Sequence, residues 1–134
     1  MKLYKYLFLS FLFVGCSANN TPSEPTLRLA IWANYLPDEL VEKFQKENGV
    51  KLVISNFSSN EELLAKMQAG GAQYDLIIPS DYMVGIMVQQ HLLRPLDPKL
   101  LPNTKHVDRD YMGKAYDPKN QYTFPYGWGT VGIT

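Results

Sequence analysis

The 134-residue sequence lacks most of the features that mark a particular chemistry. It has one cysteine, Cys16, which excludes an internal disulfide framework and a multi-cysteine metal cluster. Its 13 basic and 13 acidic side chains cancel, so the basic stripe of a nucleic-acid-binding protein is missing. No G-x-S-x-G, H-E-x-x-H or phosphate-binding-loop motif occurs. We therefore expect a protein that is not an enzyme, holds no cofactor or metal, and has no nucleic-acid partner.

A long hydrophobic run is also missing. The apolar stretch at residues 6–14 is too short to span a bilayer, which needs about 20 residues, but it suits the core of a secretory signal. Lys2 and Lys5 precede this stretch, and Gly15 and Cys16 follow it. The Gly-Cys end resembles the lipobox of bacterial lipoproteins, which implies that a lipidated Cys16 becomes the N-terminus. The alternative is an ordinary secretory signal whose cleavage site contains a cysteine.

The chain after this signal divides into a tether and a folded part. Residues 17–26 (SANNTPSEPT) are small, polar and proline-containing, as in flexible linkers. We predict a signal peptide at residues 1–15, a tether from Cys16 at residues 16–26, and one folded domain at residues 27–134. The folded part is long enough for one hydrophobic core and little more.

Apolar periodicity and helix-cap residues predict strands that alternate with helices. We expect strands at residues 27–32, 51–55 and 74–79, and helices from Pro37 to Gly49, from Ser59 to Gly70, and from Ser80 or Asp81 onwards. Short helical stretches near 98–101 and 108–113 and closing strands at 122–126 and 130–134 should follow. The apolar centre of the third strand is typical of a strand covered on both faces. This order implies a small three-layer α/β domain with a parallel sheet.

The two histidines do not suggest catalysis. His91 is expected to share an apolar helix face with Val84 and Met87, and His106 lies in a loop, so both are interpreted as structural. A small flavodoxin-like enzyme or response domain would need a phosphate-binding loop after the first strand. Residues 32–35 do not supply one, which disfavours that alternative.

Polar and aromatic side chains follow the first and third predicted strands. Ligands bind beyond the carboxyl ends of the strands in an open parallel sheet, at the switch in strand order. The residues that follow these two strands are Trp32, Asn34, Tyr35, Ser80, Asp81 and Tyr82. Aromatic faces attract cations and pack on methylenes, so this set suits an alkyl-ammonium ligand, with Asp81 as partner of the ammonium group. The alternative is that Trp32 and Tyr82 are core or rim aromatics and Asp81 is a helix cap.

Three segments resemble one known family. Residues 27–44 (LRLAIWANYLPDELVEKF), 74–84 (YDLIIPSDYMV) and 124–129 (FPYGWG) are similar to the spermidine/putrescine-binding proteins of bacterial ABC importers. The resemblance covers residues 27–134, with all segments in the order of the family. It implies a two-lobed, periplasmic-binding-protein-like (type II) fold, an extracytoplasmic location, a polyamine ligand and an ABC permease as partner.

The resemblance also implies roles for individual residues. Trp32 and Tyr35 correspond to aromatic residues that line the polyamine cleft, and Ser80 and Tyr82, with Asp81 between them, correspond to a second contact loop. Tyr126 and Trp128 fall in the approach to the hinge between the lobes. Asn34 departs from the pattern, because several polyamine binders have an acidic residue there. An amide accepts a hydrogen bond from an ammonium group but does not neutralise it.

The length of the chain is the larger departure from the family. We expect an N-terminal lobe, truncated at the hinge or part of a split product, in which the second lobe is absent. Family members close two lobes around a ligand, and a single lobe offers only half of that cleft. Two alternatives stay open: a lobe for another small solute, cationic or iron-containing, and a non-functional remnant.

Overall fold

Three parallel strands form the sheet in the computed structural model, which describes residues 24–70, 73–129 and 132. The strands are β1 (Thr26–Trp32), β2 (Lys51–Phe57) and β3 (Leu76–Ile77), in the order β2-β1-β3. The predicted signal, Cys16 and most of the predicted tether lie outside the described residues, as does nearly all of the predicted strand at 130–134. No helix of the described part of the chain has the length and apolar character that crossing a membrane requires.

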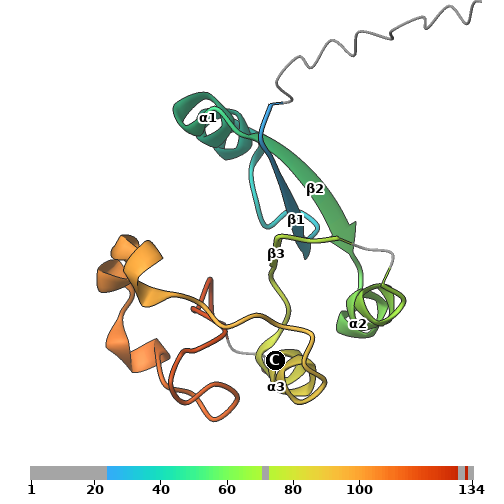
Figure 1. Ribbon diagram of the computed structural model, residues 1–134, viewed down its shortest axis with the longest axis vertical. Coiled ribbons are helices and arrows are strands. Elements are labelled where there is room, and N and C mark those ends of the chain that lie inside the picture. Colours follow the sequence, from blue (N-terminus) through green and yellow to red (C-terminus); the bar gives the residue numbers. More distant parts are fainter. Residues whose placement is uncertain (1–23, 71–72, 130–131, 133–134) are drawn as a thin grey trace, which may run out of the picture.

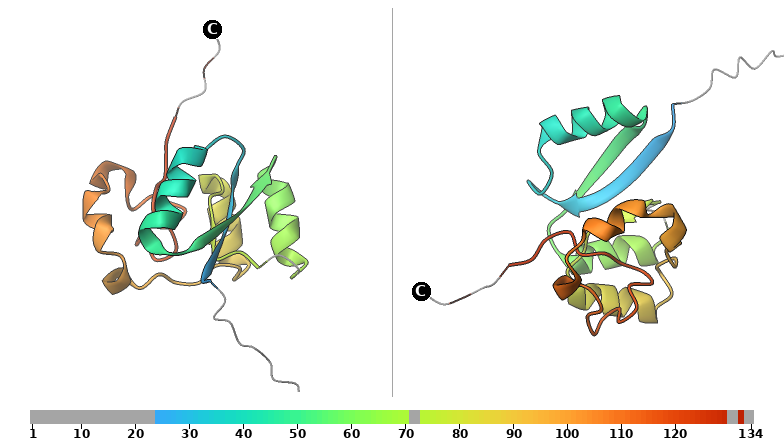
Figure 2. Two further views of the ribbon diagram at one scale, coloured as in Figure 1. Left: turned by 90° about the horizontal axis from the view of Figure 1, so that it is seen from above. Right: turned by 90° about the vertical axis from the view of Figure 1, so that its left-hand side faces the viewer.

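Helices cover both faces of this sheet. Helix α1 (Asp38–Asn48) lies on one face, and helices α2 (Asn60–Gln68) and α3 (Asp81–Gln89) lie on the other, as Figures 1 and 2 show. Three short 3-10 helices follow, η1 (Pro98–Leu100), η2 (Pro102–His106) and η3 (Arg109–Tyr111). The predicted three-layer α/β architecture with a parallel sheet is confirmed.

The main core lies between the sheet and the pair α2 and α3. Its buried members are Ala30, Phe57, Leu63, Met83 and Met87. Burial of each large side chain of this kind contributes roughly 1.5–3 kcal/mol, so this cluster holds α2 and α3 in place. The loops that precede both helices are therefore attached to a rigid support.

The third strand is shorter than predicted and is not covered on both faces. The backbone N–H of Arg28 donates to the Asp75 carboxylate at 2.7 Å instead of to a backbone carbonyl. At the other end of the strand, the Ser80 N–H, which is the next to face β1 after that of Ile78, donates to Asn60 Oδ1 at 3.0 Å, so regular pairing is limited to Leu76–Ile77. Leu76 is 51% exposed because α1 packs over β2, at the opposite edge of the sheet. The expectation of a fully covered strand was wrong for this reason.

The end of α3 corrects the prediction for His91. The helix ends at Gln89, and His91 beyond it is exposed and has a φ of 57°, a left-handed conformation that terminates helices. The N–H of Leu92 donates to the carbonyl of Met87 at 3.0 Å and completes that helix end. His91 therefore does not share the apolar face of Val84 and Met87.

Residues 122–126 do not form the predicted strand. The buried Asp117 carboxylate accepts hydrogen bonds from the backbone N–H groups of Gln121, Tyr122 and Thr123 at 2.8–3.0 Å. These donors are thereby removed from any strand ladder, and Pro125 offers none. The segment is a loop held by one carboxylate.

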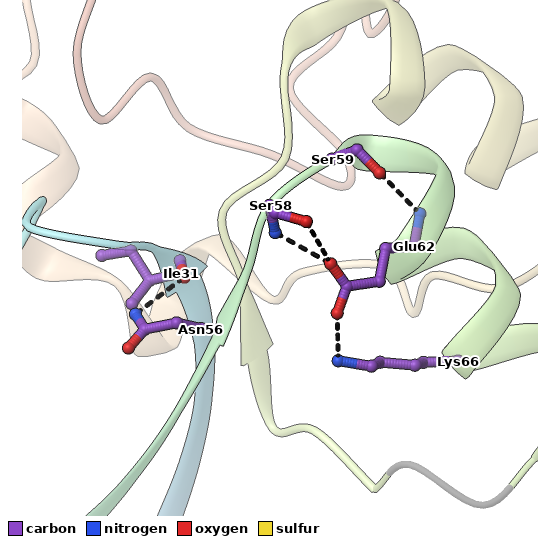
Figure 3. A network of polar contacts seen from close by, with 6 residues as sticks. All are labelled: Ile31, Asn56, Ser58, Ser59, Glu62 and Lys66. Atoms are coloured by element: carbon purple, nitrogen blue, oxygen red, sulfur yellow. Dashed lines mark hydrogen bonds and ion pairs between the residues drawn. The ribbon is translucent and has the colours of Figure 1, made fainter.

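The start of α2 is a dense polar network (Figure 3). The Ser59 hydroxyl accepts from the Glu62 N–H at 3.1 Å, which confirms the predicted cap. The Glu62 carboxylate accepts from Lys66 at 2.6 Å and from both the N–H and the hydroxyl of Ser58. These bonds, from Lys66 first and then from Ser58, lower the pKa of Glu62 to about 2. The Asn56 amide meanwhile donates to the Ile31 carbonyl at 3.1 Å and joins the ends of β2 and β1.

This network predicts a specific acid sensitivity. Because the pKa of Glu62 is depressed in the folded chain, its contribution to stability is complete above about pH 4.5 and is lost as the pH falls toward 2. Glu62→Gln should lower the free energy of unfolding at neutral pH and should flatten its decline between these two pH values. Urea denaturation at a series of pH values measures both effects. Glu42→Gln, on exposed α1, is the control, and an equal flattening in that variant would contradict the assignment.

Candidate functional site

Three loops meet at the carboxyl edge of the sheet because β1 pairs in parallel with both neighbours. Trp32 at the end of β1 lies beside Phe57 at the end of β2. On the other side, the N–H of Ile78 donates to the Ala30 carbonyl at 2.9 Å, so the chain after β3 continues beside the end of β1. The loops after β1 and β3 are adjacent, as predicted, and the loop after β2 joins them at the same edge.

The buried amide of Asn60 connects two of these loops. Its Oδ1 accepts from the Ser80 N–H at 3.0 Å, and its Nδ2 donates to the Ser80 hydroxyl at 3.0 Å and to the Tyr82 hydroxyl at 2.9 Å. The Tyr82 hydroxyl donates in turn to Glu61 Oε1 at 3.0 Å. Ser80 and Tyr82 are thus held by the first two residues of α2, and the Tyr82 ring is left 52% exposed.

Trp32 belongs partly to the core. Its ring packs on Phe57 with centroids 4.6 Å apart and an interplanar angle of 58°. The residue is only partly buried and lies against the cluster that contains Met83, on the side of the sheet that carries α2 and α3. Trp32 therefore packs against the core without being fully buried, which is compatible with both interpretations left open for it.

Tyr35 lies beside Tyr126, which comes from the distant C-terminal segment. The two rings stack at 6.4 Å with an angle of 23°, and the Tyr126 hydroxyl donates to the Tyr35 carbonyl at 2.7 Å. Both side chains are 55% exposed. Asn34, just before Tyr35, has a φ of 63°, a conformation that Asn tolerates better than most residues. The structure thus brings one residue of the predicted hinge to the loop after β1.

Trp128 lies with a different group of residues. Its ring stacks on Tyr111 of η3 at 5.4 Å and 24°, and it remains 71% exposed. Tyr111, Tyr126 and Trp128 line a shallow groove of about 280 Å³. The two predicted hinge residues are therefore neighbours of one groove, although each stacks on a separate partner.

The hydrogen bond of the Asp81 side chain is separate from those of Asn60. Asp81 Oδ1 accepts from the Tyr82 N–H at 2.7 Å, and one turn later on the same side of α3, Gly85 lies against Tyr116. Burial raises the pKa of Tyr116, and the charges of Asp81 and Asp117 raise it further. The Asp81 carboxylate thus bonds the backbone N–H of Tyr82 and lies near Tyr116, while the carboxylate bonded to the Tyr82 hydroxyl is that of Glu61.

A larger groove among the described residues has the wrong charge for a cationic ligand. It has a volume of about 430 Å³, and its lining includes Lys105, Arg109 and Lys119. A polyamine would be repelled by these three cations, so the larger volume of this groove does not make it the candidate ligand site. Nowhere in residues 24–70, 73–129 and 132 do three His, Cys, Asp or Glu side chains form a group suited to a metal ion.

Sequence reasoning missed Asn60 and Glu61. Both residues directly follow the predicted cap Ser59, and their positions in the first turn of a helix are explained by helix formation alone, so the sequence gives no reason to predict a ligand contact there. The signal that points to them is topological: with β1 in the middle of the sheet, the loop after β2 ends at the same edge as the other two. Attention to the first and third strands alone left out this third loop.

The chain is similar to a well-defined group of known proteins. The family described as bacterial extracellular solute-binding protein matches residues 31–134. The spermidine/putrescine-binding periplasmic protein of Escherichia coli K12 is 38% identical over 124 residues, which cover 91% of this chain and 35% of that protein. The putrescine-binding periplasmic protein SpuD of Pseudomonas aeruginosa is 34% identical, over 99% of this chain and 37% of its own length.

Solved structures give the same result. A putative spermidine/putrescine ABC transporter from Listeria monocytogenes matches with a TM-score of 0.76 and 40% identity, over 79% of this chain and 33% of that one. The TpPotD lipoprotein of Treponema pallidum matches with a TM-score of 0.72 and 37% identity, over 76% and 32%. These neighbours have the type II periplasmic-binding-protein fold. The present chain spans about a third of the length of the relatives it matches.

The Asn60 network leads to a prediction about stability. Asn60→Ala leaves the Ser80 N–H without its partner, so we expect the free energy of unfolding to fall by about 1–3 kcal/mol. Urea denaturation at neutral pH provides the measurement. Asn48→Ala, at the exposed end of α1, is the matched control and should change the value by less than about 0.5 kcal/mol. Equal effects of the two substitutions would show that the buried amide has no special role.

Proposed function

The chain belongs to the bacterial extracellular solute-binding proteins, and we propose that it contributes a polyamine-binding surface to a component of an ABC importer. Proteins of this family bind solutes and are not enzymes. The proposed ligands are spermidine and putrescine, for which the similar Escherichia coli protein is named. The proposed partner is the ABC permease that receives the ligand.

One structural observation supports this proposal above the others. The carboxyl edge of the sheet presents the half-exposed Tyr35 and Tyr82, the partly buried Trp32, and a carboxylate in contact with the Tyr82 hydroxyl. Polyamines consist of ammonium groups joined by methylenes, and aromatic faces attract the first and pack on the second. In the proposed site, Trp32, Tyr35 and Tyr82 provide these contacts, Ser80 and Asn34 offer hydrogen-bond acceptors, and Asp81 adds negative charge.

The strength of such a site follows from its parts. Three aromatic contacts contribute about 0.5–2 kcal/mol each. Their sum is about 1.5–6 kcal/mol, against about 4 kcal/mol for a dissociation constant of 1 mM, so the cost of immobilising a flexible ligand makes millimolar affinity the upper bound for these contacts alone. Binding involves no covalent step.

Tyr126 and Trp128 form the proposed approach to a hinge. The bond from the Tyr126 hydroxyl to the Tyr35 carbonyl connects this segment to the ligand loop after β1. Movement of the segment that contains Tyr126 would therefore shift Tyr35, and ligand binding at Tyr35 would shift this segment. This coupling is the proposed route by which ligand binding reaches the permease.

The location we propose is extracytoplasmic, with Cys16 lipidated and residues 16–26 as the tether to the membrane. The relatives are named periplasmic proteins, and the similar protein from Treponema pallidum is named a lipoprotein. Cys16 is the only cysteine of the chain, and it directly follows Gly15 at the end of the apolar stretch.

A labelling experiment tests the anchor. Cells that express the full chain should incorporate radiolabelled fatty acid into it, and Cys16→Ala should abolish the label, because no other thiol is available in the chain. Ser17→Ala provides the control and should keep the label. Persistent labelling of the Cys16→Ala chain would contradict the proposed anchor.

A second candidate ligand is another small solute, cationic or iron-containing. The observation that favours it is Asn34, an amide where several polyamine binders carry an acidic residue. The amide supplies no negative charge to the loop after β1 and so weakens the case for a ligand with several ammonium groups.

Tryptophan fluorescence distinguishes the two candidates. The chain has two tryptophans, so Trp128→Phe leaves Trp32 as the sole reporter at the proposed site. Putrescine or spermidine should change its emission, with half-saturation at about millimolar concentration or above. The uncharged isostere 1,4-butanediol is the matched control ligand and should have no effect. An unchanged signal with both polyamines, together with a response to ferric citrate, would favour the second candidate.

A further inference from the structure

The direction of each hydrogen bond around Tyr82 is determined by the protein. The Ser80 N–H donates only, so the Asn60 atom that faces it at 3.0 Å is the oxygen Oδ1. The amide nitrogen Nδ2 therefore faces the Tyr82 hydroxyl at 2.9 Å and donates to it. The hydroxyl proton must point to its other neighbour, Glu61 Oε1, at 3.0 Å. The Glu61 carboxylate is thus held at the rim of the exposed Tyr82 ring.

Glu61 keeps its negative charge available, whereas its neighbour Glu62 does not. In the part of the chain that the structure describes, the ion pairs are Lys43 with Glu47 and Lys66 with Glu62. Glu62 is further occupied by the N–H and hydroxyl of Ser58. Glu61 is solvent-exposed, and the hydrogen bond recorded for its carboxylate in the described residues uses Oε1 alone. The second oxygen is open to a ligand.

Asp81 is the less suitable carboxylate for a ligand at the Tyr82 ring. One of its oxygens accepts from the Tyr82 N–H at 2.7 Å, at the start of α3. Its side of α3 continues to Gly85, which packs against Tyr116 and not against α2. Glu61, in contrast, reaches the hydroxyl end of the Tyr82 side chain from α2.

We propose that Glu61 is the carboxylate that binds an ammonium group of the ligand at Tyr82, and that Asn60 is the positioning residue for this pair. The inference rests on the proposed polyamine function and adds the group that supplies charge selectivity. The ammonium group donates to Glu61 Oε2 while the adjacent methylenes pack on the Tyr82 ring. The negative charge that Asn34 does not provide is thereby supplied from the start of α2.

Calorimetric titration of the full chain with putrescine and with 1,4-butanediol tests this assignment. Glu61→Gln should weaken putrescine binding about tenfold or more, as expected for loss of a charge-assisted hydrogen bond. It should also reduce the preference for putrescine over the diol, a readout that a purely structural role would not change. Glu61→Asp keeps the charge and should weaken binding less. Glu42→Gln, on α1 at the opposite face of the sheet, should bind as the wild type does.

The outcomes separate this inference from the function on which it rests. If the wild-type chain binds putrescine and Glu61→Gln binds it equally well, Glu61 is not the ligand group, while the proposed function stands. If the wild-type chain shows no preference for putrescine over the diol, both are overturned. Thermal unfolding of each variant reports whether it folds. If Glu61→Gln does not fold, Glu61→Asp provides the test: putrescine binding by this variant that is weaker than putrescine binding by the wild-type chain, but stronger than binding of the diol, supports the assignment. If Glu61→Asp binds putrescine no more strongly than it binds the diol, the assignment of Glu61 is contradicted.

Discussion

The hydrogen bonds of β1 to both of its neighbours are the constraint on which the rest of this domain depends. Because the three strands are parallel, their carboxyl ends, and so the loops that follow them, lie at one edge of the sheet. The aromatic residues after β1, the polar residues that begin α2, and those that begin α3 are therefore neighbours although they are far apart in sequence. The bond from Ile78 to the Ala30 carbonyl continues this alignment beyond the two residues of β3 itself.

A buried amide converts this proximity into a defined surface. Asn60 is 4% exposed, and both of its polar atoms are used to hold Ser80 and Tyr82. A buried polar group is costly unless it is satisfied, so the favourable arrangement of the two loops is the one in which these bonds form. The core beneath, with Leu63 from α2 and Met83 from α3, holds the same helices from the apolar side. The candidate site is consequently built on helix starts that are fixed by both packing and hydrogen bonds.

Much of this fold could be predicted from local sequence signals, and the failures have physical causes. The Ser59 cap and the Gly49 end were predicted because caps depend on neighbouring residues only. The strand predicted at residues 122–126 was wrong because the carboxylate of Asp117 takes its N–H groups, an interaction that apolar patterning does not reveal. His91 was misplaced because it occupies a left-handed helix end where glycine is usual. For the site, the parallel sheet predicted that the loops after the first and third strands are adjacent, but the position of Glu61 beside Tyr82 is evident only from side-chain geometry.

The central claim is that the carboxyl edge of the sheet, and not the larger basic groove near η2 and η3, binds an alkyl-ammonium ligand. Backbone amide NMR spectra of the chain, recorded during a putrescine titration, test it most directly. The account predicts chemical shift changes that cluster at residues 32–35, 58–61 and 80–82 and that are absent with 1,4-butanediol. Changes centred on Lys105, Arg109 and Lys119, or equal changes with the uncharged diol, would contradict it.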